Sequence, residues 1–367
     1  MAMTAQRFAR AAVMVEPRQD LVLREYPVPH APPGGAVVRV TCCTICRSDL
    51  HTWRGLRPAP TPIILGHEIV GTIAELGPGL ARDVRDQPLA VGDRVTWTLH
   101  SACGKCRYCV EFRLPMKCRS LRKYGHDSCQ APPHLRGGLA EYCQIDAGTS
   151  LLKLPPGLPD FAAAPANCAA ATAAAAWEAA ELKSGDSVLI QGAGALGCYA
   201  AALAAHAGCR RVVVVDVNAR RLQFIRRFGA TDCIDASNAA VDAVAAIKEL
   251  TEGLGVDAAL EVAGDPAIIE TGLLSLRTGG RYIELGCSFP GARATIDMSI
   301  VLWKLLTVRG VHNYDVRHLI TAVDALHEAQ DRFPLGDVVG ASFGLEEVNA
   351  ALRAAHEGTA MRVAVIP

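Results

Sequence analysis

The chain has 367 residues, of which 50% are hydrophobic, and its 37 basic side chains balance 37 acidic ones. This length favours two domains over one, and the balanced charge argues against nucleic acid as a partner, because binding to a phosphate backbone needs a basic surface. No apolar stretch of membrane-spanning length runs uninterrupted, and the apolar part of the N-terminal segment is far too short for a secretory signal. We therefore expect a cytoplasmic protein with no membrane partner.

The part of the chain before Phe161 is predicted to be rich in β-structure. Short runs with β-branched residues occur at Val37–Thr41, Glu68–Ile73 and Asp93–Thr98, and turn sequences rich in Gly and Pro bound them. Runs of this length and composition, separated by turns, are typical of strands in an irregular all-β region.

From about Phe161 onwards the pattern changes to strands that alternate with helices. An Ala-rich helical stretch is followed by five apolar runs of strand length, at Val188–Gln191, Val212–Asp216, Ala258–Val262, Tyr282–Leu285 and Thr307–Gly310. The stretches between them have helical length, and such alternation predicts an α/β fold with a doubly wound parallel sheet. The final part of the chain returns to a mixed pattern, and we expect it to complete the first domain.

A glycine-rich sequence directly follows the first of these five strands. Gly192, Gly194 and Gly197 have the G-x-G-x-x-G spacing and precede an Ala-rich stretch that suits a helix. Such glycines permit a tight turn, close approach of the backbone to a pyrophosphate and close contact between helix and sheet, while the helix N-terminus attracts the phosphates. The sequence predicts a dinucleotide site here, the alternative being a purely structural turn.

The end of the second strand bears on the choice of dinucleotide. Asp216 lies nineteen residues after Gly197, where a carboxylate can accept hydrogen bonds from the ribose hydroxyls of NAD and repel the 2′-phosphate of NADP. Arg220 and Arg221 follow closely, and an arginine at this strand end can contact the cofactor and accept a 2′-phosphate. We predict NAD as the cofactor, with NADP as the alternative.

Four cysteines are clustered in one short segment. Cys103, Cys106, Cys109 and Cys118 are separated by two, two and eight residues. In a reducing compartment such density indicates metal ligation rather than disulfides. Four thiolates form a closed tetrahedral shell around zinc and leave no position for a substrate. We therefore predict a structural zinc site in a lobe spanning 100–120, the alternative being four unrelated thiols.

Candidates for a second metal site are spread over three segments. Cys46 stands in TICRSDLH, His67 in LGHE, and Cys168 at the entrance to the second domain. A catalytic zinc needs three protein ligands and one open position, and these residues can supply the ligands beside a bound cofactor. A lone histidine is more simply a core residue, but the pairing of His67 with Cys46 and a nearby acid favours the metal site.

Together these motifs resemble the zinc-containing medium-chain dehydrogenase/reductase family. The resemblance extends over essentially the whole chain and rests on C-R-S-D-L-H at Cys46–His51, G-H-E at Gly66–Glu68, the cysteine lobe, and the glycine sequence with Asp216. It implies a GroES-like catalytic domain over 1–161 and 312–367 and a Rossmann domain over 162–311. It also implies a zinc-dependent enzyme that transfers a hydride between an alcohol and NAD, giving a ketone or aldehyde.

The resemblance further implies roles for residues around the catalytic zinc. Cys46, His67 and Cys168 would be the three ligands, and Glu68 would approach the metal transiently. Asp49 would orient His67 through the second nitrogen of its ring. With the cysteine lobe, this gives two zinc ions per chain.

Other roles implied by the family concern the proton and the cofactor. Ser48 would accept the proton of the substrate hydroxyl, and His51 would deliver it to the surface. Arg47 would contact the pyrophosphate, and Thr172 would lie against the nicotinamide. Because Ser48 is smaller than the threonine common in relatives that oxidise primary alcohols, a secondary or bulky alcohol is favoured.

Eight residues separate Cys109 from Cys118, where most family members have seven. With this longer gap and the sequence HTWRGLRPAPTPIILGHE, the chain resembles a subgroup of phosphonate-catabolism-associated and hydroxycamphor-type dehydrogenases. Basic residues in this part of the chain are either solvated surface charges, the simpler interpretation, or contacts for an anionic substrate: Arg54, Arg57 and Lys123. The sequence does not identify the alcohol.

Two other classes of protein compete with this interpretation. A zinc-free reductase of the same fold would generally lack the set Cys46, His67 and Cys168, and a non-catalytic NAD-binding protein would have no use for a proton relay. The expected partners are a small alcohol or carbonyl substrate and further copies of the chain. The family implies a homodimer or homotetramer, with the strand around Leu305–Val311 extending a sheet across a two-fold axis.

Overall fold

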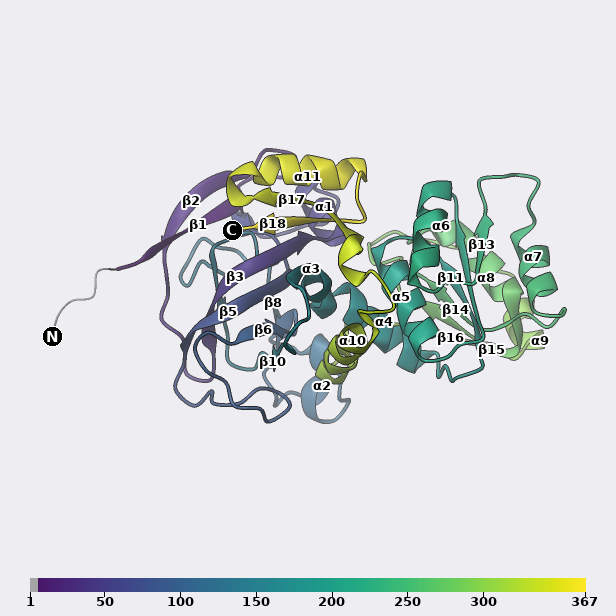
Figure 1. Ribbon diagram of the computed structural model, residues 1–367, viewed down its shortest axis with the longest axis horizontal. Helices are drawn as coiled ribbons and strands as arrows, with labels where there is room; N and C mark the ends of the chain where they lie inside the picture. The colour runs from purple at the N-terminus through teal and green to yellow at the C-terminus, as the bar shows by residue number, and fades with distance from the viewer. Residues whose placement is uncertain (1–5) are drawn as a thin grey trace. The chain divides into compact units, whose positions relative to one another are not determined.

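The computed structural model describes residues 6–367. Contacts within the chain define two compact units (Figure 1). Unit 1 contains the chain up to Cys168 together with Asp315–Val323 and Gly336–Pro367, and unit 2 contains Ala169–Tyr314 and Asp324–Leu335. Within the described residues, no helix combines the length and the apolar character needed to cross a membrane.

These units differ from the domain boundaries predicted at 161/162 and 311/312. Residues 162–168 belong to unit 1 and 312–314 to unit 2, so both boundaries lie slightly later in the chain. A larger difference concerns Asp324–Leu335, which the prediction placed in the first domain but which packs within unit 2. One contact that ties this segment to unit 2 joins the Glu328 carboxylate to the ring of His206, at 3.1 Å.

The strands of unit 1 form three sheets. The largest has the order β10-β6-β5-β3-β18-β17 with β9 also paired to β3, a second has the order β2-β1-β4, and β7 pairs with β8. The strands are β1 (Phe8–Met14), β2 (Val22–Pro27), β3 (Ala36–Ile45), β4 (Ile63–Ile64), β5 (Glu68–Leu76), β6 (Arg94–Trp97), β7 (His100–Ser101), β8 (Arg122–Lys123), β9 (Tyr142–Ile145), β10 (Leu151–Lys153), β17 (Val339–Gly344) and β18 (Arg362–Ile366).

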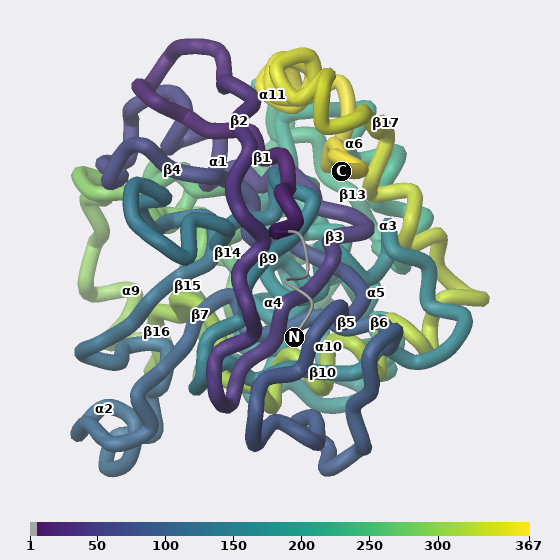
Figure 2. Tube along the Cα trace, turned by 90° about the vertical axis from the view of Figure 1, so that its left-hand side faces the viewer, coloured from purple at the N-terminus to yellow at the C-terminus, as the bar shows by residue number. Residues whose placement is uncertain are grey.

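Short helices connect these strands. They are α1 (Arg47–Trp53), α2 (Arg107–Val110), η1 (Pro115–Lys117), α3 (Asp160–Ala163), η2 (Ala164–Asn167), η5 (Leu335–Val338), η6 (Leu345–Glu347) and α11 (Val348–Glu357), and α10 (Val316–Ala329) belongs partly to each unit. Figure 2 shows α2 and the loop around it projecting from the rest of unit 1.

The C-terminal strand β18 is inserted into the large sheet of unit 1. It runs antiparallel to β3, with Val363 opposite Ile45, and parallel to β17. Its central residues, Val363, Ala364 and Val365, are fully buried, which explains why this apolar run forms an interior strand. The pairing brings Arg362 beside the end of β3, where Cys46 follows.

Unit 2 is built around a six-stranded parallel sheet with the order β13-β12-β11-β14-β15-β16. Numbered from β11, this is the order 3-2-1-4-5-6 of dinucleotide-binding sheets. Helices α5 and α6 pack on one face and α7 and α8 on the other (Figure 1). The strands are β11 (Ser187–Gln191), β12 (Arg211–Asp216), β13 (Asp232–Asp235), β14 (Val256–Glu261), β15 (Leu276–Glu284) and β16 (Thr307–Gly310).

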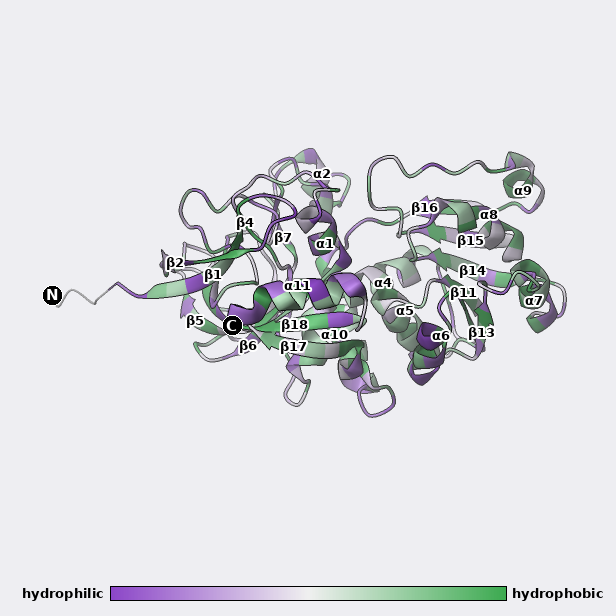
Figure 3. Cartoon of the chain, turned by 90° about the horizontal axis from the view of Figure 1, so that it is seen from above, coloured by the Kyte–Doolittle hydropathy of each residue, from purple (hydrophilic) through white to green (hydrophobic). Residues whose placement is uncertain are grey.

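The helices of unit 2 form the two layers that cover this sheet. They are α4 (Ala169–Ala179), α5 (Ala195–His206), α6 (Ala219–Ile225), η3 (Arg226–Phe228), α7 (Ala243–Leu250), η4 (Pro266–Ile268), α8 (Ile269–Ser275) and α9 (Met298–Trp303). The strand β11 is buried along its whole length, and hydrophobic residues gather on the central strands (Figure 3). Burial on both faces is what a parallel sheet covered by two layers of helices requires.

Candidate active site and metal centres

A buried group of potential metal ligands lies within unit 1. Cys46 follows β3, His67 and Glu68 stand at the start of β5, and Cys168 follows η2. One ligand atom from each of the four residues lies within 4.8 Å of the others. The structure therefore brings together the three residues predicted as ligands and the acid predicted to approach the metal.

The backbone around Cys46 and His67 is fixed by one carboxylate. Asp49, in the first turn of α1, accepts a hydrogen bond from the Cys46 backbone N–H at 2.8 Å and another from the Gly66 N–H at 3.1 Å. Gly66 has φ +91°, and a Cβ there would lie 2.6 Å from the sulfur of Cys43. The residue before His67 must therefore be glycine, which adopts this conformation without steric cost.

The same carboxylate orients the imidazole of His67. The Nδ1 atom of His67 lies 3.1 Å from Asp49 Oδ1, and both side chains are buried. Burial lowers the pKa of His67, but Asp49 and then Cys46 together outweigh this effect, and the net pKa lies well above its usual value. A proton held on Nδ1 leaves Nε2 as the nitrogen available to a metal, and Ser48 Oγ lies 3.3 Å from that atom.

Glu68 is held by a residue that the sequence interpretation missed. Arg362 of β18 donates two hydrogen bonds to the Glu68 carboxylate, at 2.9 and 3.1 Å, and Thr44 donates a third at 2.6 Å. Burial raises the pKa of Glu68 to about 7, and Arg362 opposes that shift. The only signal in the sequence is that Arg362 is the one charged residue in the terminal strand, 294 residues away from its partner.

The two thiols of this group are hydrogen-bonded to each other. The Cys168 thiol donates to Cys46, which lowers the pKa of Cys46 well below its usual value against the effect of burial and raises that of Cys168. The Arg362 guanidinium, 3.7 Å from the Cys46 sulfur, also favours the Cys46 thiolate. A thiolate is the form in which cysteine binds metal.

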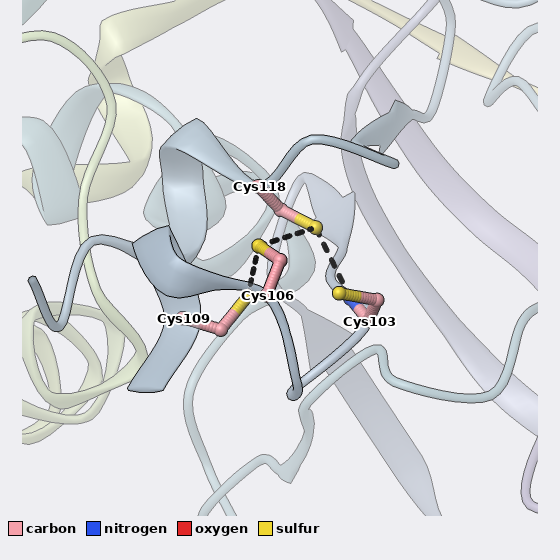
Figure 4. Close-up of side chains that lie close together, drawn as sticks. All are labelled: Cys103, Cys106, Cys109 and Cys118. Carbon is pink, nitrogen blue, oxygen red and sulfur yellow. Dashed lines mark hydrogen bonds between the residues drawn. The ribbon is translucent and has the colours of Figure 1, made fainter. Parts of the chain in front are cut away.

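The second group consists of the four clustered cysteines (Figure 4). The sulfur of Cys106 lies 3.5 Å from that of Cys109 and 3.9 Å from that of Cys118, and all four sulfurs lie within 4.8 Å of one another. Tetrahedral zinc with bonds of about 2.3 Å places its sulfurs about 3.8 Å apart. The arrangement has the size of a zinc tetrathiolate, and the eight-residue gap contains a turn, η1, that returns the chain to Cys118.

Backbone N–H groups favour the thiolate form of two of these cysteines. The N–H groups of Lys105 and Cys106 lower the pKa of Cys103, and that of Arg119 is the main cause lowering the pKa of Cys106 to about 6. The pKa of Cys109 is instead raised to about 12, first by desolvation and then by its hydrogen bond with Cys106. All four are free of disulfides, so the thiols are available for a metal.

The glycine-rich turn of unit 2 has the form expected of a phosphate-binding loop. Gly192 has φ +120°, and a Cβ there would lie 2.9 Å from the Ala263 nitrogen. A Cβ on Gly197 would lie 2.1 Å from the Gly192 carbonyl oxygen, so the helix can approach the loop only without a side chain. Gly194 faces open space and begins α5 with no side-chain cap, which leaves room for a ligand at the helix N-terminus.

Asp216 lies beside this turn at the end of β12. Its carboxylate accepts hydrogen bonds from the backbone N–H groups of Ala193, at 2.7 Å, and Asn218, at 2.8 Å. The acid is thereby fixed at the edge of the glycine-rich loop. Arg221 is half-buried on α6, where its N–H donates to the capping side chain of Asn218.

The remaining predicted residues lie on α1 and α4. Arg47 is exposed at the first position of α1, and Ser48 and His51 share a face of that helix, three residues apart. Burial and then Arg47 lower the pKa of His51, so its ring is neutral at pH 7. Thr172 is half-buried on α4, four residues after Cys168.

Sequence profiles of two protein families match the chain. The alcohol dehydrogenase GroES-like domain matches residues 32–156, and the zinc-binding dehydrogenase domain matches residues 195–328. Among curated proteins, the L-threonine 3-dehydrogenase of Paraburkholderia phytofirmans is 33% identical over 84% of both chains. The 5-exo-hydroxycamphor dehydrogenase of Pseudomonas putida is 29% identical over 97% of this chain and 98% of its own.

Solved structures give the same result. An alcohol dehydrogenase from Thermotoga maritima matches with a TM-score of 0.93 at 29% identity, covering 98% of this chain and all of its own. A zinc-binding dehydrogenase from Sinorhizobium meliloti 1021, solved bound to NADP, matches with a TM-score of 0.86 at 26% identity, over 99% of this chain and all of its own. The chain belongs to the zinc-containing medium-chain dehydrogenase/reductase family. It is an oxidoreductase that acts on CH–OH groups, as the sequence predicted.

Proposed function

We propose that this protein oxidises a secondary or bulky alcohol to a carbonyl compound with NAD as hydride acceptor, at a zinc ion held by Cys46, His67 and Cys168. The observation that carries the proposal is the convergence of these three ligands, two buried and one half-buried, with His67 fixed by Asp49, in a chain of this family. Unit 1 would be the catalytic domain and unit 2 the cofactor domain.

The donor set suits a catalytic zinc. Two thiols and an imidazole are ligands that zinc prefers, and a site with three protein ligands keeps one position open for substrate. The Glu68 carboxylate already accepts hydrogen bonds from Arg362 and Thr44, which supports a position away from the metal between its transient approaches. Zinc bound there supplies a Lewis acid that lowers the pKa of an alcohol. This set also argues against a zinc-free reductase of the same fold.

The residues of α1 can move the hydroxyl proton. Ser48 Oγ lies 3.3 Å from the metal-facing nitrogen of His67, within reach of a substrate hydroxyl bound at the open position. His51, on the same face of the helix, is neutral at pH 7 because burial and Arg47 lower its pKa, so its ring can accept the proton and release it to solvent.

The cofactor is proposed to lie on unit 2, at Gly192, Gly194 and Gly197, and it supplies the ring that accepts the hydride. The fixed carboxylate of Asp216 favours the ribose hydroxyls of NAD and opposes a 2′-phosphate. Arg221 would then contact the adenosine side of the cofactor. Arg47 and Thr172 would contact its pyrophosphate and nicotinamide, as in the family.

The four-cysteine group is proposed to bind the second zinc, in a structural role. Its lobe has little core of its own, because Val110, Phe112 and Leu114 are exposed. A metal with four thiolate ligands would supply the cross-links that packing does not.

We also infer a homodimer or homotetramer formed through the edge strand β16. All four of its residues are exposed, and Trp303, which ends the preceding helix, is 77% exposed. An open strand edge beside apolar side chains favours pairing with a second copy of the chain. Light scattering tests this, because a monomeric mass would contradict it. The cytoplasmic location stays a prediction from the sequence.

The experiment that tests the proposed reaction is a cofactor-reduction assay with primary, secondary and cyclic alcohols, run with NAD and with NADP. We expect turnover that prefers NAD, is abolished by a zinc chelator and returns with added zinc. Turnover that survives complete removal of the metal, or none with any alcohol, would contradict the proposal.

A further inference from the structure

Three neighbouring residues with nitrogen-bearing side chains lie beside the candidate catalytic metal site and have no part in the proposed reaction. Arg57 lies in the loop after α1, Lys123 in β8, and His126 three residues further on. All three are half-buried and belong to unit 1. The ring of His126 lies 5.1 Å from the ring of His67, so this group stands next to the predicted metal ligand.

The contacts of His126 leave the charge of Arg57 uncompensated. His126 Nδ1 lies 2.7 Å from the Tyr124 carbonyl oxygen, so that nitrogen carries the hydrogen, and Nε2 accepts a hydrogen bond from Arg57 at 3.0 Å. The imidazole is neutral in this arrangement, in agreement with a pKa of about 3 caused first by burial and then by His67 and Arg57. Arg57 is thus positioned by a neutral group and keeps its full positive charge.

Lys123 is a second cation without a counter-charge. It stands opposite His100 in the two-stranded β7–β8 sheet and is close enough to Arg57 for their charges to repel. Across residues 6–367, no carboxylate lies within ion-pair distance of Lys123 or Arg57. The acid nearest in sequence, Asp127, contacts Arg122 at 3.1 Å and Arg136 at 3.6 Å instead.

Lys123 is also close to the metal site, because its carbonyl oxygen accepts a hydrogen bond from the N–H of His126 at 3.2 Å, and His126 stands next to His67. Cys168 favours the charge of Lys123, whereas burial, Arg57 and Lys117 disfavour it, and the net effect lowers the pKa of Lys123 to about 8. Two like charges held near each other, half-buried and unpaired, are unfavourable unless an anion binds between them. The sequence alone makes Arg54 an equal candidate for an anion contact, but its side chain is exposed, unlike those of Arg57 and Lys123.

We propose that Arg57 and Lys123 bind an anionic group of the substrate, which is therefore an alcohol that carries a carboxylate or a phosphonate-like group. This inference rests on the proposed function, because it assumes that the hydroxyl of the same molecule binds at the site of Cys46, His67 and Cys168. The anion is held by a guanidinium and an ammonium, and His126 acts as a positioning residue that aims the guanidinium.

The first test compares alcohols that differ only in charge. The ratio of kcat/KM for 3-hydroxybutanoate over 3-hydroxybutanamide, and the matching ratio for 2-hydroxypropylphosphonate over its dimethyl ester, are measured in the holoenzyme. We expect at least one ratio above about ten, falling roughly 10- to 100-fold in Lys123→Met and in Arg57→Met, since hydrogen bonds to charged groups have effects of this size. Arg54→Met is the matched control, with the ratios unchanged.

Ratios near one in the native enzyme, or losses of equal size for the charged and neutral alcohols in both variants, would overturn the inference. A second test needs no turnover: calorimetric titration with propanoate and ethylphosphonate, with propanamide as the neutral control. Binding of either anion that is lost in Lys123→Met supports the inference, and binding no tighter than that of propanamide contradicts it. If neutral alcohols are oxidised but anions neither react nor bind, this inference fails alone; if no alcohol is oxidised, the proposed function fails.

Discussion

The two cysteine-containing groups of unit 1 are built in opposite ways. The group at Cys46 is mostly buried and is assembled from segments spread over more than a hundred residues, with a histidine and an acid among its members and Arg362 beside them. The group at Cys103–Cys118 comes from one short, largely exposed lobe and contains only thiols, polarised by backbone N–H groups.

Because the two groups are built differently, we expect them to have different roles. In the lobe, four like ligands would close the shell around a metal, whose contribution would be to hold a loop that lacks a core. In the other group, three ligands would leave one position open, and Asp49 and Ser48 place polar atoms beside His67. Removing a ligand should therefore affect catalysis in one group and stability in the other.

The largest expected effect is on catalysis. Cys46→Ala should lower kcat/KM at least about a thousandfold, because a Lewis acid contributes several kcal/mol to the transition state and each 1.36 kcal/mol is a factor of ten. Steady-state kinetics measure this, and the thermal midpoint should hardly change. Cys143→Ala, a buried cysteine outside both groups, is the control. Activity within tenfold of the native enzyme would contradict the account.

Cys106→Ser should produce the reverse pattern. Loss of the lobe metal removes cross-links from exposed chain, and a loss of about 4 kcal/mol corresponds to a fall of roughly 10 °C in Tm. Differential scanning calorimetry measures the shift, with the half-buried Cys209→Ser as control. An unchanged Tm would mean that the lobe does not depend on its metal.

Asp49→Asn should weaken the buried site without destroying it. Asparagine keeps one acceptor for the N–H groups of Cys46 and Gly66 but loses the charge that fixes the proton on His67 Nδ1. Groups that orient a metal ligand are worth about 10- to 100-fold in activity or metal affinity. Kinetics at several zinc concentrations check this. Asp160→Asn, at a carboxylate that binds Thr41 and Arg94, should have no such effect.

The smallest effect is a pH dependence specific to charged substrates. Burial, Arg57 and Lys117, opposed by Cys168, lower the pKa of Lys123 to about 8, so its charge is present below pH 8 and lost above it. The ratio of kcat/KM for 3-hydroxybutanoate over its amide should fall between pH 7 and pH 9, approaching about tenfold per pH unit at the upper end. His126 stays neutral throughout this range. A flat ratio, or the same fall in Lys123→Met, contradicts the assignment.

Much of the fold could be predicted from the sequence because its patterns are local. The alternating strands of unit 2 lie where apolar runs predicted them, at β11, β12, β14, β15 and β16. The strand β13 was missed, since its sequence DCID has no β-branched run and alternates with acids. The strand β1 was missed because three of its seven residues are alanine, which has no strand preference.

The candidate site could be predicted in part for the same reason. The residues of the cysteine lobe lie within one short segment and so do those of the glycine turn, and the structure gives each segment the predicted local arrangement. Arg362 could not be found, because its contact with Glu68 depends on the register of β18 against β3. The lone charges Arg57 and Lys123 were indistinguishable from surface residues, since the absence of a counter-ion is a property of the folded chain.

The most direct test of the central claim is the zinc content of the purified protein and of two variants, measured by mass spectrometry of the metal. The account predicts two zinc ions per chain in the native protein and one in each of Cys46→Ala and Cys106→Ser, the first inactive and the second active at low temperature. A native protein with no zinc, or a Cys46→Ala variant that keeps both ions, would contradict it.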